Sequence, residues 1–223
     1  MNKLYNMYGY KVNKKIDDIS KLIWVFCLAS LAGNFIEVLY CRLVAGVWMS
    51  RSSVIYGPFS IVWGLGAVVL TVVLSRFSQK SIMCLFWIGA LMGGVYEYVC
   101  SIITEVFLGT VFWDYSHMKL HIGGRTNVLF MGFWGILSVG WIKFCYPRLS
   151  RYIERIPVVY RNTIAWVIVG FMVWDSLISV MAMERYQARR AGIPAEGIVE
   201  EFLDRNYQDE LIEQVWPNMM IVD

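Results

Sequence analysis

The sequence GGVYEYVCSIITEVFLGTVFWDYSHMKLHIGGRTNVLFMGFW occupies residues 93–134 and changes character twice. It starts in apolar, helix-forming sequence that carries Glu97, and it passes through the polar run Trp113-Asp114-Tyr115-Ser116. It returns to apolar sequence after Gly123-Gly124-Arg125. A carboxylate within an apolar span is costly, so it is expected to have a partner or a function. The segment indicates a polar centre in a membrane protein.

Composition supports the membrane class. Of 223 residues, 58% are hydrophobic and only 17% are charged, and the mean hydropathy is +0.53. These values lie outside the usual balance of a soluble domain. The net charge of +3 is small and the basic residues are scattered, so nucleic acid is not an expected partner. The expected environment is a lipid bilayer.

Five stretches are long enough to cross a hydrocarbon core, which needs about 20 apolar residues per helix. We predict an all-α integral membrane protein with about five transmembrane helices. The domains are a basic N-terminus (1–21), a transmembrane domain (22–183) and a C-terminal tail (184–223) with an amphipathic segment. The tail is expected to fold back on the bundle or to lie along the membrane surface. The predicted spans are Leu22–Leu43, Val54–Leu74, Ile82–Leu108, Val128–Tyr146 and Ile164–Met183.

Lys and Arg residues in short connections set the orientation of membrane helices. The N-terminal lysines, Arg76, Lys80, and the fourth connection's Arg148, Arg151, Arg155 and Arg161 all fall on one side of a five-span topology. We therefore expect a multi-pass protein of the bacterial plasma membrane, with a cytoplasmic N-terminus and a C-terminus outside.

The first four spans contain an internal repeat, with halves at about 22–75 and 82–146. A G-x-x-x-E pattern, Gly33 to Glu37 and Gly93 to Glu97, lies at matching depth in spans one and three. Each unit has two crossings, so the two hairpins are expected to be related by a pseudo-twofold axis along the membrane normal. Three further features follow in the same order, namely Trp48 and Trp113, Arg51 and Arg125, and Trp63-Gly64 and Trp134-Gly135.

The repeat brings Glu37 and Glu97 toward a common centre. Two nearby carboxylates can share a proton, hold a cation or each pair with an arginine. Arg42, Arg51 and Arg125 are available, and an acid paired with an arginine only to hold the helices together would give the same sequence. Asp175, in the middle of span five, is expected to face inward for the same reasons, either paired or as part of a pathway.

The second outer loop offers Asp114 and Tyr115 at the membrane boundary, and we expect Asp114 to pair with Arg125. The spacing of His117 and His121 matches no strong ligand signature, so neither a metal nor a cofactor is predicted. The chain has no G-x-x-x-x-G-K-[ST] motif, so ATP hydrolysis by that machinery would need a separate subunit.

Several of these motifs together resemble one family, the bacterial membrane proteins described as putative ABC-transporter type IV permeases. They are G-x-x-x-E-x-x-Y-C in span one, Arg51 before Tyr-Gly-Pro, Trp-Asp-Tyr-Ser, Gly-Arg before span four and a C-terminal Pro-Asn-Met. The resemblance runs from about Gly33 to Met220 and implies a permease-like integral membrane protein. The chain has Gly123 where the family pattern has Asn.

The favoured function is a transport subunit that moves a small solute or ion through the duplicated bundle. It would work with a separate ATPase subunit, an ion gradient or a second copy of the chain. One alternative is a membrane-embedded enzyme acting on a lipid head group through Asp114, Tyr115 and His117, and another is an assembly factor; no catalytic residue is assigned. The candidate pathway residues are Glu37, Glu97, Arg51, Arg125, Asp114, Tyr115 and Asp175.

Overall fold

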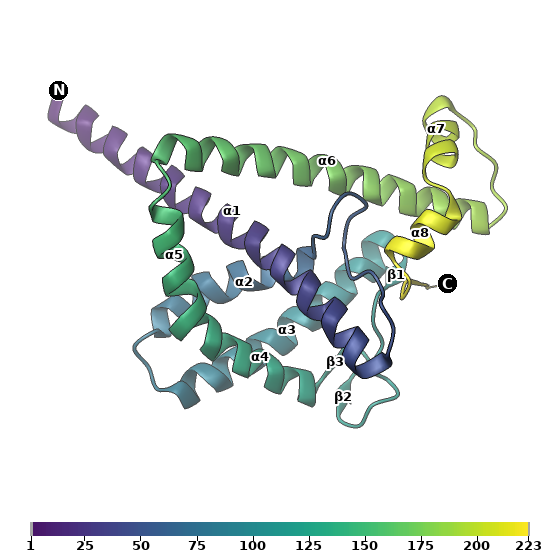
Figure 1. Cartoon of the computed structure of the whole chain (residues 1–223), viewed down its shortest axis with the longest axis horizontal. Helices are drawn as coiled ribbons and strands as arrows, with labels where there is room; N and C mark the ends of the chain where they lie inside the picture. The colour runs from purple at the N-terminus through teal and green to yellow at the C-terminus, as the bar shows by residue number, and fades with distance from the viewer. Residues whose placement is uncertain (1, 223) are drawn as a thin grey trace.

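The computed structural model describes the backbone of residues 2–222 and the side chains of residues 18–222. The described chain is mostly helical (Figure 1). Its α-helices are α1 (Asn2–Ala45), α2 (Ile61–Leu74), α3 (Ile82–Leu108), α4 (Val128–Gly140), α5 (Tyr146–Glu154), α6 (Val158–Arg190), α7 (Ile198–Asn206) and α8 (Asp209–Val215). Short strands β1 (Thr110–Val111) and β4 (Met220–Ile221) pair antiparallel, as do β2 (His121–Ile122) and β3 (Thr126–Asn127).

Four helical segments are long and apolar enough to cross a membrane: Asp18–Ala45, Ile82–Leu108, Val128–Glu154 and Val158–Arg190. The third consists of α4 and α5 joined by a π-helical turn at Trp141–Cys145. Many large apolar side chains on these helices are exposed, as expected for surfaces that face lipid. The prediction of a helical membrane protein is confirmed.

The predicted second span is shorter than expected. Instead of starting at Val54, helix α2 starts at Ile61 and has 14 residues. At 1.5 Å per residue it covers about 21 Å, whereas a hydrocarbon core is about 30 Å thick. The Gly57-Pro58 pair explains the late start, because the residue before a proline disfavours helical backbone and Gly57 has a φ of 96°.

The first helix runs without interruption from Asn2, so the backbone has no break at the predicted boundary near residue 21. The side chains of Lys3, Lys11, Lys14 and Lys15, which contributed to the predicted orientation, lie outside the described residues. Lys21 is described, and its Nζ lies 2.7 Å from Glu154 Oε1.

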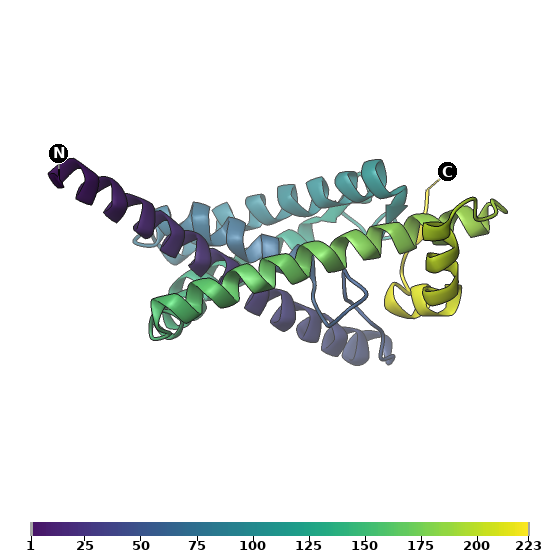
Figure 2. The ribbon, with the colours of Figure 1, turned by 90° about the horizontal axis from the view of Figure 1, so that it is seen from above.

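Helices α1 and α2 pack as a first hairpin, and α3 and α4 pack as a second, while α6 crosses the bundle beside α1 (Figures 1 and 2). The chain alternates direction, so the two termini lie at opposite ends of the molecule. At the end nearer the N-terminus, Trp24 Nε1 donates to the Arg161 carbonyl at 3.1 Å. At the other end, Gln187 Nε2 donates to the Leu108 carbonyl at 2.8 Å.

Each hairpin closes on a glycine and tryptophan contact. A Cβ built on Gly33 would lie 2.1 Å from Trp63 Cγ, and one built on Gly93 would lie 2.1 Å from Trp134 Cγ. Only glycine can therefore let these helices approach so closely. The two tryptophans also meet each other across the hairpins, stacked with ring centroids 6.1 Å apart.

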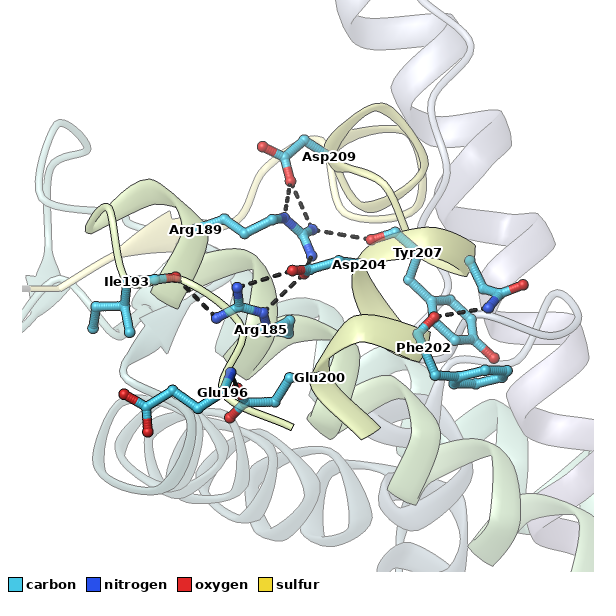
Figure 3. Close-up of polar contacts among 10 residues, drawn as sticks. Arg185, Arg189, Ile193, Glu196, Glu200, Phe202, Asp204, Tyr207 and Asp209 are labelled. Carbon is cyan, nitrogen blue, oxygen red and sulfur yellow. Dashed lines mark hydrogen bonds and ion pairs between the residues drawn. The ribbon is translucent and has the colours of Figure 1, made fainter. Parts of the chain in front are cut away.

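The C-terminal tail folds back on the extended end of α6 (Figure 3). The fifth helix was predicted to end at Met183, but α6 continues to Arg190. Arg185 donates two hydrogen bonds to the Asp204 carboxylate at 2.8 and 2.9 Å. Arg189 contacts both Asp204 and Asp209. A small core forms beneath these pairs from Ala182, Met183, Tyr186, Leu203, Tyr207, Ile212 and Trp216.

Candidate functional site

Glu37 projects from the end of α1 toward the first hairpin's loop. Arg51 Nε donates to its Oε2 at 3.0 Å, and Trp63 Nε1 donates to its Oε1 at 2.9 Å. The tryptophan that packs on Gly33 therefore also binds the carboxylate one turn further along α1. Both charged side chains of the pair are partly exposed.

Glu97 occupies the matching position in α3 but has different partners. Its Oε1 accepts from the Tyr115 hydroxyl at 2.8 Å, and its Oε2 accepts from the Thr126 hydroxyl at 2.8 Å. Among the described residues no cation forms an ion pair with it. Glu97 is 9% exposed, so a buried carboxylate is held here by neutral donors alone.

Tyr115 contacts Glu97 and is influenced by the charge of Glu37. Burial raises the pKa of Tyr115 well above its ordinary value, and the charges of Glu97 and Glu37 raise it further, while Arg51 opposes them. The glutamates of both hairpins therefore influence the pKa of Tyr115. Its ring stacks on Phe130 at 4.7 Å between centroids, which fixes its orientation.

The expected pairing of Asp114 with Arg125 is wrong. Arg125 instead forms an ion pair with Glu105 and donates from Nη1 to the Ser101 hydroxyl at 3.1 Å. Asp114 accepts from the backbone N–H and the hydroxyl of Ser116 at 2.8 and 2.7 Å. These local bonds form a turn with little loss of chain entropy, and they lower the pKa of Asp114.

The same loop contains the residues of the metal and enzyme alternatives. No cluster of three or more His, Cys, Asp or Glu ligands occurs in the part of the chain that the structure describes. His121 Nδ1 accepts from the Gly124 N–H at 3.0 Å. The Tyr115 hydroxyl is bonded to Glu97, while Asp114 is bonded to Ser116, so the proposed acid and hydrogen-bond donor have separate partners.

Asp175 is fully buried and supports a backbone segment. Its Oδ1 accepts from the Tyr56 N–H at 3.1 Å, and Ser179 Oγ accepts from the Ile55 N–H at 2.9 Å. Asp175 lies near the midpoint of α6, so the loop before α2 reaches the middle depth of the bundle. Non-helical backbone is tolerated at that depth only where protein satisfies its polar groups.

A cavity of about 260 Å³ lies where this loop, the start of α2, the end of α3, the second half of α6 and the tail meet. Of the seven predicted pathway residues, Glu37 and Arg51 line it, whereas Glu97, Tyr115, Arg125, Asp114 and Asp175 do not. Sequence reasoning missed its other polar and aromatic walls, because they come from distant segments. They include Thr104, Trp113, Ser176, Trp216 and Asn218.

This fold defines a multi-pass α-helical membrane protein with ionisable groups between its helices. The family described as "Putative ABC-transporter type IV" matches residues 24–180, and the chain belongs to that family. No curated protein and no solved structure matches the chain.

Proposed function

We propose that the protein is a transport subunit that moves a small solute or ion through a bundle of two related hairpins. The observation that carries this proposal is the cavity beside the Glu37 and Arg51 pair, at the start of a helix that is too short to cross the membrane without the loop before it. Discontinuous helices form substrate sites near the midplane of many transporters. Family membership supports the same class of function.

Matched contacts support duplication of the hairpins. Besides the two glycine and tryptophan contacts, Phe26 packs on Gly64 and Phe86 packs on Gly135, with built Cβ atoms 2.6 and 2.7 Å from the rings. Each contact recurs in the same order in the other hairpin. The copies would differ in chemistry, since one glutamate is paired with arginine and the other is held by hydroxyls.

We place the N-terminus in the cytoplasm and the C-terminus outside, in a bacterial plasma membrane, following the distribution of basic residues. A cavity of about 570 Å³ then opens on the cytoplasmic side between the α2 to α3 connection and α5. Its lining includes Lys143, Arg151 and Glu154. A separate ATPase subunit would dock at this end.

Uptake by membrane vesicles tests the transport role. Vesicles from cells that overproduce the chain would retain a partner ATPase, and they would be offered a small-molecule cell extract with ATP or an ion gradient. Mass spectrometry of the vesicle contents should show at least one solute enriched over vesicles without the chain. Glu37→Gln and Glu97→Gln should each slow that uptake at least about tenfold, because each removes a charged hydrogen-bonded group from the pathway and so alters either solute binding or solute release.

Glu201→Gln is the matched control, because Glu201 is an exposed carboxylate on α7. It should leave uptake unchanged. Equal contents in vesicles with and without the chain, or equal uptake by wild type and both pathway variants, would contradict the proposal.

A further inference from the structure

The cavity beside Glu37 and Arg51 has more hydrogen-bond donors than its own residues use. Arg51 donates to Glu37 only from Nε, and within the described chain its two Nη atoms have no hydrogen-bond partner. Trp216 is 4% exposed, and its Nε1–H has no partner among the described residues either. Both side chains line the cavity.

The start of α2 adds to the positive character of the cavity. Ser60, Ile61 and Val62 line it, and the Ser60 side chain does not cap the helix. Ser53 Oγ accepts from the Ile61 N–H at 2.9 Å, which satisfies one of the first-turn donors. The remaining first-turn N–H groups and the helix dipole favour an anion at this end.

The carboxylate in the cavity is already engaged. Glu37 is the one carboxylate in the lining, and it is occupied by Arg51 and Trp63. The rest of the wall is largely apolar, and it includes Leu108, Phe112, Val180, Met183 and Val215. Unused donors beside an apolar wall fit a ligand with acceptor oxygens at one end and hydrocarbon at the other.

We infer that this cavity binds a small organic oxyanion, a carboxylate or phosphate that carries a short apolar portion. Its oxygens would contact Arg51, Trp216 and the first turn of α2, and its apolar part would pack on α6 and the tail. The inference deepens the proposed transport function by naming the class of solute, and its meaning as a solute rests on that function. The ligand could be a free anion or the head group of an anionic lipid.

The tail closes the cavity. Trp216, Pro217 and Asn218 line it, although they follow α8 and lie far from Arg51 in the sequence. The tail is fixed by the β1 and β4 pairing and by the arginine and aspartate contacts in Figure 3. A ligand in the cavity would therefore be covered by the C-terminal segment.

Calorimetric titration of the purified full chain in phosphatidylcholine nanodiscs tests the inference. The probes are butyl phosphate and hexanoate, with butanol as the uncharged comparison. Both anions should bind and butanol should not. Arg51→Gln should weaken binding about tenfold or more, because a charged hydrogen bond contributes roughly 1.5–3 kcal/mol. Trp216→Phe, which keeps the ring and removes the N–H, should weaken it severalfold.

Glu37→Gln should act in the opposite direction. It removes the carboxylate that competes for Arg51, so anion binding should become tighter. Arg205→Gln, on the exposed face of α7, is the charge control and should change nothing. Absence of binding by both anions, equal binding of butanol, or weaker binding in Glu37→Gln would overturn the inference.

The source of the anion is resolved by native mass spectrometry from nanodiscs that contain phosphatidic acid. A lipid that stays bound to wild type, is lost in Arg51→Gln and is displaced by butyl phosphate would assign a head group. Binding of the soluble probes without lipid retention would assign a free solute. If the chain binds the anionic probes but its vesicles take up no solute, the result would support this site while contradicting the proposed transport role.

Discussion

The two intramembrane glutamates illustrate how one motif can place a residue without defining its chemistry. Glu37 and Glu97 occupy the same position of a G-x-x-x-E pattern, and Tyr115 responds to both charges. The partners of Glu37 come from a loop and from α2, whereas those of Glu97 both come from the longer connection between α3 and α4. The motif therefore predicts where the carboxylates lie, whereas tertiary contacts decide whether each is paired with a cation or held by hydroxyls.

The glycines of that motif give a sharp prediction at the same scale. Gly93→Ala should destabilise the protein by about 1–3 kcal/mol, because the new Cβ would overlap the Trp134 ring and force repacking. Thermal unfolding in detergent measures the change. Gly132→Ala in α4 is the matched control, since a Cβ there meets no atom within 4 Å. It should be neutral or stabilising, given the helix propensity of alanine. Equal destabilisation by both substitutions would show that helix approach is not the reason for Gly93.

At the scale of elements, the sequence predicted the long helices well and α2 poorly. Residues 54–60 are apolar enough to extend a span, and the Gly57-Pro58 break is visible in the sequence. The groups that hold this loop in place, Asp175 and Ser179, lie about 120 residues later. No local pattern could connect them to Tyr56, so the loop's depth in the bundle could not be predicted.

That connection leads to a second prediction. Asp175→Ala removes the acceptor of the Tyr56 N–H and leaves a buried donor unsatisfied, which costs about 1–3 kcal/mol. Hydrogen exchange of residues 54–58 should become faster. Asp175→Asn keeps an acceptor oxygen and should retain most of the protection. Unchanged exchange in Asp175→Ala would mean that this loop is held by other contacts.

The tail is a second element whose attachment depends on a few charges. Hydrogen bonds from Arg185, then from Arg189, lower the pKa of Asp204 below its ordinary value of 3.8. Because the pKa of Asp204 is depressed in the folded protein, its carboxylate stabilises the tail fully at pH values above the ordinary pKa. This stabilisation is lost as the pH falls through the lower pKa of the folded protein. Burial and a 2.9 Å hydrogen bond to Tyr56 raise the pKa of Tyr207 to about 12. The Tyr207 hydroxyl therefore stays neutral, and its hydrogen bond to Tyr56 stays intact, in the acidic range where Asp204 is protonated.

We therefore expect tail release to occur only below about pH 4. Limited proteolysis with pepsin, which is active in that range, should cut residues 191–208 increasingly as the pH is lowered from 4 to 2. In Asp204→Asn, cleavage should already be extensive at pH 4. A wild-type cleavage pattern in Asp204→Asn at pH 4 would show that the arginine contacts do not hold the tail.

At the scale of the whole molecule, the membrane class and family could be predicted from composition and motifs, and both are confirmed. The cavity could not be predicted, because its walls come from residues 37–62, 104–113, 176–183 and 215–218. Trp216 and Asn218 belong to the tail, which was predicted to fold back on the bundle or to lie along the membrane surface, without a contact to any particular loop. Hydrophobic periodicity and motif spacing in the sequence do not show which distant segments come together in space.

The two hairpins meet at one shared centre, where Trp63 stacks on Trp134. A double-mutant cycle with Trp63→Leu, Trp134→Leu and the combined variant measures that contact directly, using the free energy of unfolding in detergent. The stacked arrangement predicts a coupling energy of about 0.5–1.5 kcal/mol. Strictly additive effects would mean that the hairpins do not meet there and would contradict the account.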